Sequence, residues 1–141
     1  MVVEAQRVAA FVFDALVADA TFSAAVGGRI YRDQVPQAAT LPAAIVGPIV
    51  SSVSLSTVGG LRVWDDVSVD VHLVAAGGSY APINAAADRA DAVLQNRSGT
   101  SGGVVIVELV RTAPQLFVEN EGGAVFAHIV QTYQTEAHVA P

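Results

Sequence analysis

The chain contains no cysteine and no lysine, and it carries little charge of either sign. Without cysteine it can form no disulfide, no cysteine-ligated zinc site and no thiol nucleophile. Charged residues make up 14% of its 141 residues, whereas about 25% is usual in soluble domains. A chain with so few charges and a mean hydropathy of +0.50 needs partners to cover its surface. We therefore expect an oligomer or a subunit of an assembly.

Long uninterrupted hydrophobic runs are also missing. Residues 34–61 are uncharged but are broken by Pro36, Pro42 and Pro48, and no window offers the roughly 20 apolar residues of a spanning helix. The first apolar run stops at Asp14, so we expect neither a signal peptide nor a membrane partner. The net charge of −6 and the scattered arginines argue against tight nucleic-acid binding.

Gly-Gly pairs and hydrophobic periodicity divide the chain into elements of one domain, residues 1–141. Apolar residues at helical spacing predict a helix over residues 3–18. Asp19 is a suitable N-cap for a short helix that Gly27 ends, and Ser79 is expected to cap a further helix. Strands are predicted over residues 42–53, with Pro48 implying an edge or bulge, and over residues 62–74, 104–112 and 124–136.

The clearest strand is the one over residues 62–74. Val67, Val69 and Val71 alternate there with Asp66 and Asp70, which predicts one buried face and one solvated face. A turn near residues 120–123 suggests a hairpin before the last strand. The fold class expected is α+β: a mostly antiparallel sheet of four to five strands with two main helices packed on one face, in the order α-α-β-β-α-β-β.

The candidate catalytic and metal-binding residues of the sequence each have a simpler structural interpretation. The sequence GTSGG around Ser101 matches a nucleophile elbow, but a helix precedes it and a strand follows, which reverses the required order. His72 and His128 fall in predicted strands and could meet across the sheet, yet they lack further partners. Asp66 and Asp70 lie about 13 Å apart along one strand face, too far for a glycosidase pair. The sequence therefore predicts no catalytic, cofactor-binding or metal site.

Several stretches resemble the tail-completion, or tail-terminator, proteins of long-tailed bacteriophages. They are VGGRIY at residues 26–31, the Leu41-Pro42 pair before the first long strand, DVSVDVHL at residues 66–73, and the closing stretch VRTAPQLFVENEGGAVFAHIVQTYQTEA. The resemblance extends over residues 19–136. It implies a structural virion protein of the tail-neck region, assembled in the host cytoplasm, without enzymatic activity or cofactor.

Proteins of this family form a homohexameric ring that terminates the tail tube and joins it to the head connector. The resemblance therefore implies contacts with copies of the chain itself, with tail-tube protein and with connector proteins. Duplex DNA would pass through the ring without sequence-specific binding. On this model Asp65, Asp66 and Asp70 are candidate lumen-facing acidic residues. Candidate inter-subunit or tube contacts are Arg29, Tyr31, Arg32, Trp64 and His72.

The connection between the short helix and the first long strand has an interpretation in this model. Gly27 and Gly28 would stop the helix, Arg29 to Tyr31 would pack back on the sheet, and the prolines would hold an extended arm. Two alternatives stay open. One is another connector or stopper of the phage neck, and the other is a small α+β enzyme or ligand-binding domain that uses His72 and His128 or the aspartate face.

Overall fold

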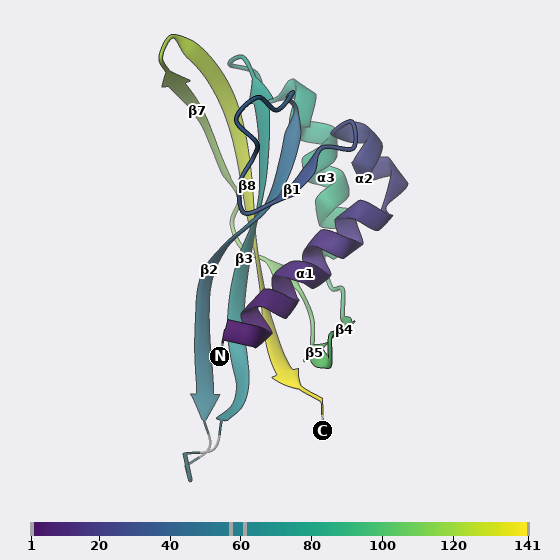
Figure 1. Ribbon diagram of the computed structural model, residues 1–141, viewed down its shortest axis with the longest axis vertical. Helices are drawn as coiled ribbons and strands as arrows, with labels where there is room; N and C mark the ends of the chain where they lie inside the picture. The colour runs from purple at the N-terminus through teal and green to yellow at the C-terminus, as the bar shows by residue number, and fades with distance from the viewer. Residues whose placement is uncertain (1, 57, 61, 141) are drawn as a thin grey trace.

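Three helices cover one face of a curled eight-stranded sheet (Figure 1). The computed structural model describes residues 2–56, 58–60 and 62–140. The helices are α1 (Val2–Ala18), α2 (Ala20–Ala25) and α3 (Ala81–Leu94). The strands are β1 (Ile30–Arg32), β2 (Ala43–Ser56), β3 (Arg62–Ala76), β4 (Gly99–Ser101), β5 (Val104–Ile106), β6 (Val110–Arg111), β7 (Gln115–Glu121) and β8 (Ala124–Val139).

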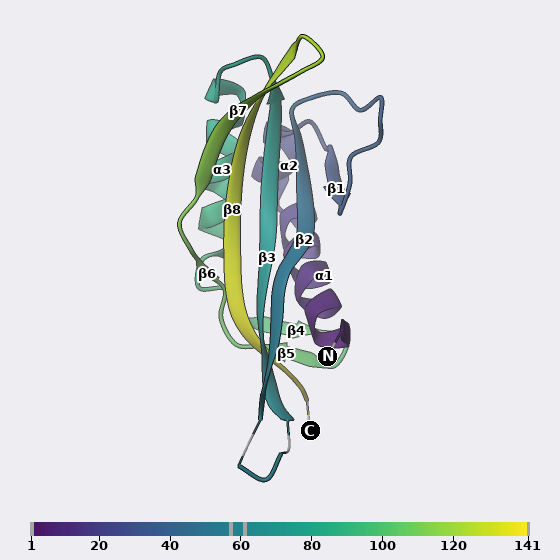
Figure 2. The same ribbon diagram turned by 90° about the vertical axis from the view of Figure 1, so that its left-hand side faces the viewer.

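The sheet is built around the long antiparallel strands β2, β3 and β8. Its order is β1-β2-β3-β8-β5-β4, and β6 and β7 pair with β8 above β5 (Figure 2). The short strand β1 is parallel to β2, whereas the other strand pairs are antiparallel. β8 therefore has partners along both of its edges, and the sheet ends at β2 and β1 on one side and at β7, β6 and β4 on the other.

An apolar stripe forms α1, and a side-chain cap begins α2. Val8, Val12 and Leu16 of α1 are fully buried against the sheet, as expected for residues that share one helix face. Asp19 begins α2, because its carboxylate accepts a hydrogen bond of 2.8 Å from the backbone N–H of Phe22. The predicted first and second helices are confirmed. The third begins with Tyr80 rather than Ser79 at the N-cap position, and the Ser79 hydroxyl accepts a hydrogen bond from Ala81 N.

The core lies between the helices and the valine face of β3. Val67, Val69, Val71 and Leu73 are each fully buried, so the strict alternation predicted for this strand is confirmed. A polar cluster links the core side of β8 to α3: the Tyr133 hydroxyl donates to Asp91 Oδ1 at 3.2 Å, and the side-chain amide of Gln131 donates to the Ala87 carbonyl. This cluster fixes β8 against α3.

The sheet is larger and more mixed than the sequence predicted, with eight strands in place of four or five. The predicted strand over residues 104–112 divides into β5 and β6, because the regular backbone ladder with β8 is interrupted at residues 107–109. Leu109 is fully buried there, and its N–H donates to the Arg97 carbonyl instead of to a strand. The strand that pairs with the hairpin end of β8 is β7, which was not predicted, and β1 and β4 were also missed.

The connection from α2 to β2 returns to the sheet as proposed. β1 pairs with residues 44–46 of β2, and the Arg29 guanidinium lies over Gly27 and donates to the Pro42 carbonyl at 2.8 Å. Register irregularities follow on either side of Ile49, which confirms the bulge that Pro48 implied. Beyond it, β2 and β3 extend as an arm past the helices (Figure 1).

Candidate functional site: the bare face of the sheet

The helices leave the opposite side of the sheet uncovered, and this side is called here the bare face (Figure 2). Because successive strand residues point to opposite faces, alternate positions of β3 and β8 supply it. None of positions 64–74 of β3 or 126–138 of β8 is Lys or Arg. The bare face residues at these positions are Trp64, Asp66, Ser68, Asp70, His72 and Val74 of β3, and Phe126, His128, Val130, Thr132, Gln134, Glu136 and His138 of β8.

Two carboxylates of the bare face are held by cross-strand hydrogen bonds. The Gln134 side-chain amide donates to both oxygens of Asp66, at 2.9 and 3.0 Å, and the Thr132 hydroxyl donates to Asp70 Oδ1 at 2.6 Å. Each bond joins β3 to β8 on the solvent side. Asp66 and Asp70 thus share one surface, as their spacing predicted, with their negative charges fixed in position.

Asp65 does not share this surface. Its side chain is fully buried on the helix side of the sheet, and the Ser54 hydroxyl donates to its Oδ1 at 2.8 Å. The β3 register explains the difference, since adjacent strand residues point to opposite faces. Of the three aspartates assigned to a lumen on the basis of the resemblance, the structure brings together Asp66 and Asp70 and separates Asp65.

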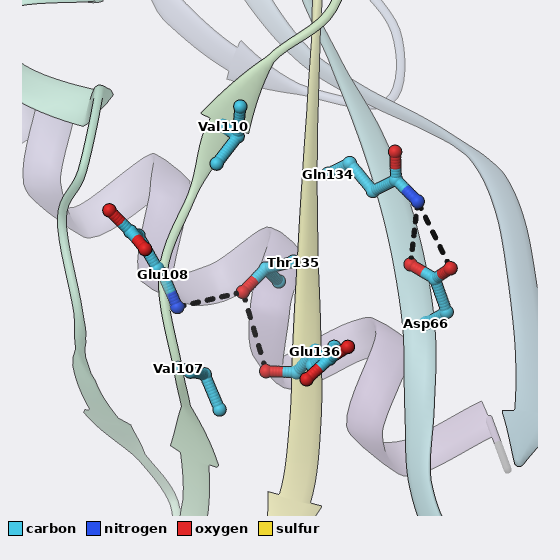
Figure 3. A pocket seen from close by; sticks show the side chains of 7 residues that line it. All are labelled: Asp66, Val107, Glu108, Val110, Gln134, Thr135 and Glu136. Atoms are coloured by element: carbon cyan, nitrogen blue, oxygen red, sulfur yellow. Dashed lines mark hydrogen bonds between the residues drawn. The ribbon is translucent and has the colours of Figure 1, made fainter.

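A hollow of about 350 Å³ lies beside Asp66 where β8 passes the break between β5 and β6 (Figure 3). Glu108 and Glu136 line it together with Asp66, so three carboxylates surround the hollow. Its wall is fixed by Thr135, whose hydroxyl oxygen accepts from the Glu108 backbone N–H at 3.3 Å. The hollow is open and acidic.

A second cluster occupies the other end of the bare face. His72 Nε2 lies 2.7 Å from His128 Nδ1, so one imidazole donates and the other accepts. The Phe117 ring of β7 stacks on His128 with centroids 4.6 Å apart, and Glu119 Oε1 lies 3.5 Å from His128 Nε2. Burial lowers the pKa of the His72 imidazole, and its neighbour His128 lowers it further, whereas Asp70 and Glu119 act in the opposite direction.

This histidine pair confirms that the two strands bring His72 and His128 together across the sheet. In the part of the chain that the structure describes, no three His, Cys, Asp or Glu side chains are placed to hold a metal ion. Among the same residues, the hydrogen bond of His72 goes to His128 and not to a hydroxyl. The cluster therefore packs β7 and β3 against β8.

The residues predicted to contact other subunits lie in three places, one of which is the pair of His72 with His128. Arg29 and Arg32 face the helices' side of the connection: Arg29 binds the Pro42 carbonyl, and the Arg32 guanidinium lies 5.8 Å from the Phe13 ring centroid. Tyr31 is half-buried in β1. Trp64 lies opposite Leu55 near the far end of the arm.

Sequence reasoning missed the partners that organise the bare face. Thr132 and Gln134 lie in a strand that was predicted, and the period-2 pattern places them on the same side as Asp66 and Asp70. The missing information was the antiparallel register, which places Thr132 opposite Asp70 and Gln134 diagonal to Asp66. Phe117 was missed because β7 has no apolar alternation against a covered face, and all seven of its residues are exposed.

Comparison with known proteins decides the family. The model of the family described as "Tail completion protein gp17" matches residues 10–136. The chain belongs to this tail completion family. In the described residues no helix is long and apolar enough to cross a membrane. Membership makes the chain a structural component of the phage virion, located in the tail, as the resemblance implied.

The fold of this tail completion protein also occurs in a solved particle. A chain of the structure entitled "Virion of native gene transfer agent (GTA) particle" is similar with a TM-score of 0.76 and 20% sequence identity. The match covers 94% of the present chain and 97% of the other. No curated protein matches the sequence. The structural likeness shows that the two chains share a fold, and the family match shows that the present chain is a tail completion protein.

Proposed function

We propose that the protein forms a ring, of six copies as the resemblance implies, that terminates the phage tail tube and joins it to the head connector. The observation that carries the proposal is the division of the sheet into a helix-covered face and a bare face with fixed polar side chains, in a member of the tail completion family. A sheet of this kind can line a central bore while the helices form the outer wall.

The charge of the bare face supports passage of DNA through such a bore. Asp66 and Asp70 are held in place by Gln134 and Thr132, and Glu136 lies beside them. Fixed carboxylates repel phosphates at short range, and the repulsion is screened beyond a Debye length of about 8 Å at physiological salt. Because positions 64–74 and 126–138 contain no Lys or Arg, the duplex meets no counter-charge there that would retain it.

The test is the mass of the purified protein in solution over a range of concentrations, alone and with tail-tube protein, with negative-stain images of the same samples. We expect a ring with an open bore that caps the end of a tube. A monomer that closes into a ring on the tube supports the proposal as well, because the tube then acts as the template. A compact dimer that binds no tube would overturn it.

Binding to the partners separates this function from that of another neck component. A terminator ring binds the end of the tube and the connector, whereas a stopper or connector ring binds the head side without tube protein. Sedimentation of the protein with polymerised tubes, and separately with connector rings, measures the difference. Binding to connector without tube would favour the stopper.

A further inference from the structure

The arm leaves one edge of β2 uncovered. β1 pairs with β2 only at residues 44–46, on the near side of Pro48. Residues 50–56 lie beside β3 along one edge, with residues 51–56 in register with it, and no described strand lies along the other edge. This segment, called here the free edge of β2, is exposed throughout, and the side chains of Val50 and Val53 are 55% and 54% exposed.

A second uncovered edge lies on the opposite side of the sheet. β7 pairs with β8 along one edge, and no described strand lies along its other edge. It is seven residues long, as is the free edge of β2, and its apolar side chains Leu116, Phe117 and Val118 are exposed. Uncovered strand edges present unpaired N–H and C=O groups to any strand that approaches.

We infer that the free edge of β2 in one copy pairs with β7 of the next copy, so that the sheets of neighbouring subunits join edge to edge. This inference rests on the proposed ring and names its interface. Three antiparallel pairings lead from β2 through β3 and β8 to β7, so β2 and β7 run in opposite directions. In a ring with cyclic symmetry, every copy has the same orientation relative to the ring axis. The next copy therefore presents its β7 antiparallel to β2.

The other uncovered edge on that side of the sheet fits less well. β4 has three residues, and because it is one strand further from β8 than β5, it runs in the same direction as β2. A copy in the same orientation would present β4 as a short parallel strand. Parallel pairs are slightly less stable per residue, and three residues offer less than half the length of β7.

Charge favours the same pairing. Each copy carries a net charge of −6, and residues 34–61 contain no charged side chain. Natural edge strands are commonly protected from association by charged residues, lysine above all, and the free edge of β2 has none. β7 carries Glu119 and Glu121. These carboxylates can approach the free edge of β2 without like-charge repulsion, because that edge is uncharged.

The positions of the two edges also define the geometry of the ring. β7 lies at the hairpin end of β8, whereas the free edge of β2 lies at the opposite end of the sheet, in the arm (Figure 1). Pairing them shifts each subunit along the strand direction of its neighbour. Such a stagger closes into a ring when the strands are inclined to the ring axis, as they are in barrels.

The absence of native cysteine allows a direct test by disulfide trapping. Ser52 and Val118 both lie on the helix side of the sheet, because their register partners Val67 and Ala127 are buried there. The variant S52C/V118C, together with S52C/L116C to allow for a shift in register, is oxidised after assembly on tail tubes. The matched control is V53C/V118C, because Val53 points to the bare face.

We expect at least one helix-side pair to give a ladder of covalent oligomers on a non-reducing gel, while the control and each single variant stay at the monomer position. A covalent dimer of S52C alone would show that two β2 edges meet and would overturn the inference. Rings that form on tubes without any cross-link would also overturn it, and leave the proposed function standing. Failure of the wild-type chain to form rings with tubes would instead overturn the proposed function.

Discussion

His72 Nε2 lies 2.7 Å from His128 Nδ1 across the β3–β8 ladder. The contact is diagonal, since the register partners of the two residues are Val130 and Val74. Phe117 stacks on His128 with centroids 4.6 Å apart, and its ring centroid lies 6.5 Å from that of His72, so three rings from β7, β8 and β3 form one cluster. A hydrogen bond between two imidazoles needs one donating and one accepting nitrogen. The bond is lost when the accepting nitrogen takes up a proton.

Stability should fall with acidification because of this pair. Folding lowers the pKa of His72 below its ordinary value of 6.5. Once the pH falls below 6.5, the unfolded chain therefore binds more protons than the folded chain. The free energy of unfolding should therefore decrease as the pH falls through 6.5 and below it, towards the lowered pKa of His72. The variant His72→Gln should flatten this slope, measured by urea titration at each pH. His138→Gln is the control, and an equal flattening in both variants would contradict the prediction.

Asp19 joins α2 to α3. Its carboxylate caps Phe22 N and accepts from Arg89 at 3.0 and 2.6 Å, and the Arg89 contact is the main reason that the pKa of Asp19 falls to about 2. Asp19→Ala should lower the melting temperature at neutral pH. The difference from wild type should shrink as the pH falls below 3.8 towards 2, where the carboxylate takes up a proton in both states. Asp88→Ala, an exposed residue of α3, should leave the melting temperature almost unchanged.

The buried Tyr133 hydroxyl should contribute measurably to stability. It contacts Asp91 and Gln131, and burial together with Asp91 raises the pKa of the phenol far above its usual value. Tyr133→Phe should lower the free energy of unfolding by about 1 to 3 kcal/mol, since buried acceptors lose a donor. Tyr31→Phe is the control, because no described hydrogen bond involves that hydroxyl. Equal effects in denaturant titration would contradict the prediction.

Gly47 should tolerate no side chain. Its φ is +127°, and a Cβ there would lie 2.5 Å from Asp33 Oδ1. Gly47→Ala should lower the free energy of unfolding by about 1 to 3 kcal/mol, combining a rare backbone conformation with a steric clash. Gly28→Ala measures the backbone term alone, because its φ is +75° and no described atom lies within 4 Å of its added Cβ. A smaller effect at Gly47 than at Gly28 would show that the clash is relieved.

The acidic row of the bare face should control DNA passage. The double variant D66R/D70R places guanidinium groups where the proposed bore faces phosphate, and each contact adds salt-dependent retention of DNA. We expect particles of normal appearance with DNA ejection slowed by on the order of tenfold at low salt, and less at high salt. Asp14→Arg on the exposed side of α1 is the control. Unchanged ejection in the double variant would remove these residues from the bore.

The helices and the central strand could be predicted from sequence because their signals are local. Asp19 followed by Phe22 specifies an N-cap, and the valines of β3 alternate without exception over residues 67–71. These patterns depend only on residues close together in the sequence, so the structure shows the same cap and the same alternation that the sequence predicts. The bulge at Pro48 was predictable for the same reason, because proline removes a strand donor.

The edges of the sheet could not be predicted in this way. β7 has no covered face, so its side chains show no period of two between apolar and polar residues. Residues 104–112 have the composition of one strand, but Leu109 leaves the ladder to fill the core. The bonds of Asp66 to Gln134 and of Asp70 to Thr132 depend on the β3–β8 register, which joins residues more than sixty positions apart.

The alternation of β3 and β8 has an evolutionary consequence. Every second residue of these strands belongs to the core beneath α1 and α3, and the residues between them belong to the bare face. A substitution at Asp70 or Gln134 therefore changes what the surface offers to a partner while the packing of Val69 or Tyr133 stays intact. Descendants of one ancestral fold can adapt this surface to new partners without rebuilding the interior that keeps them folded.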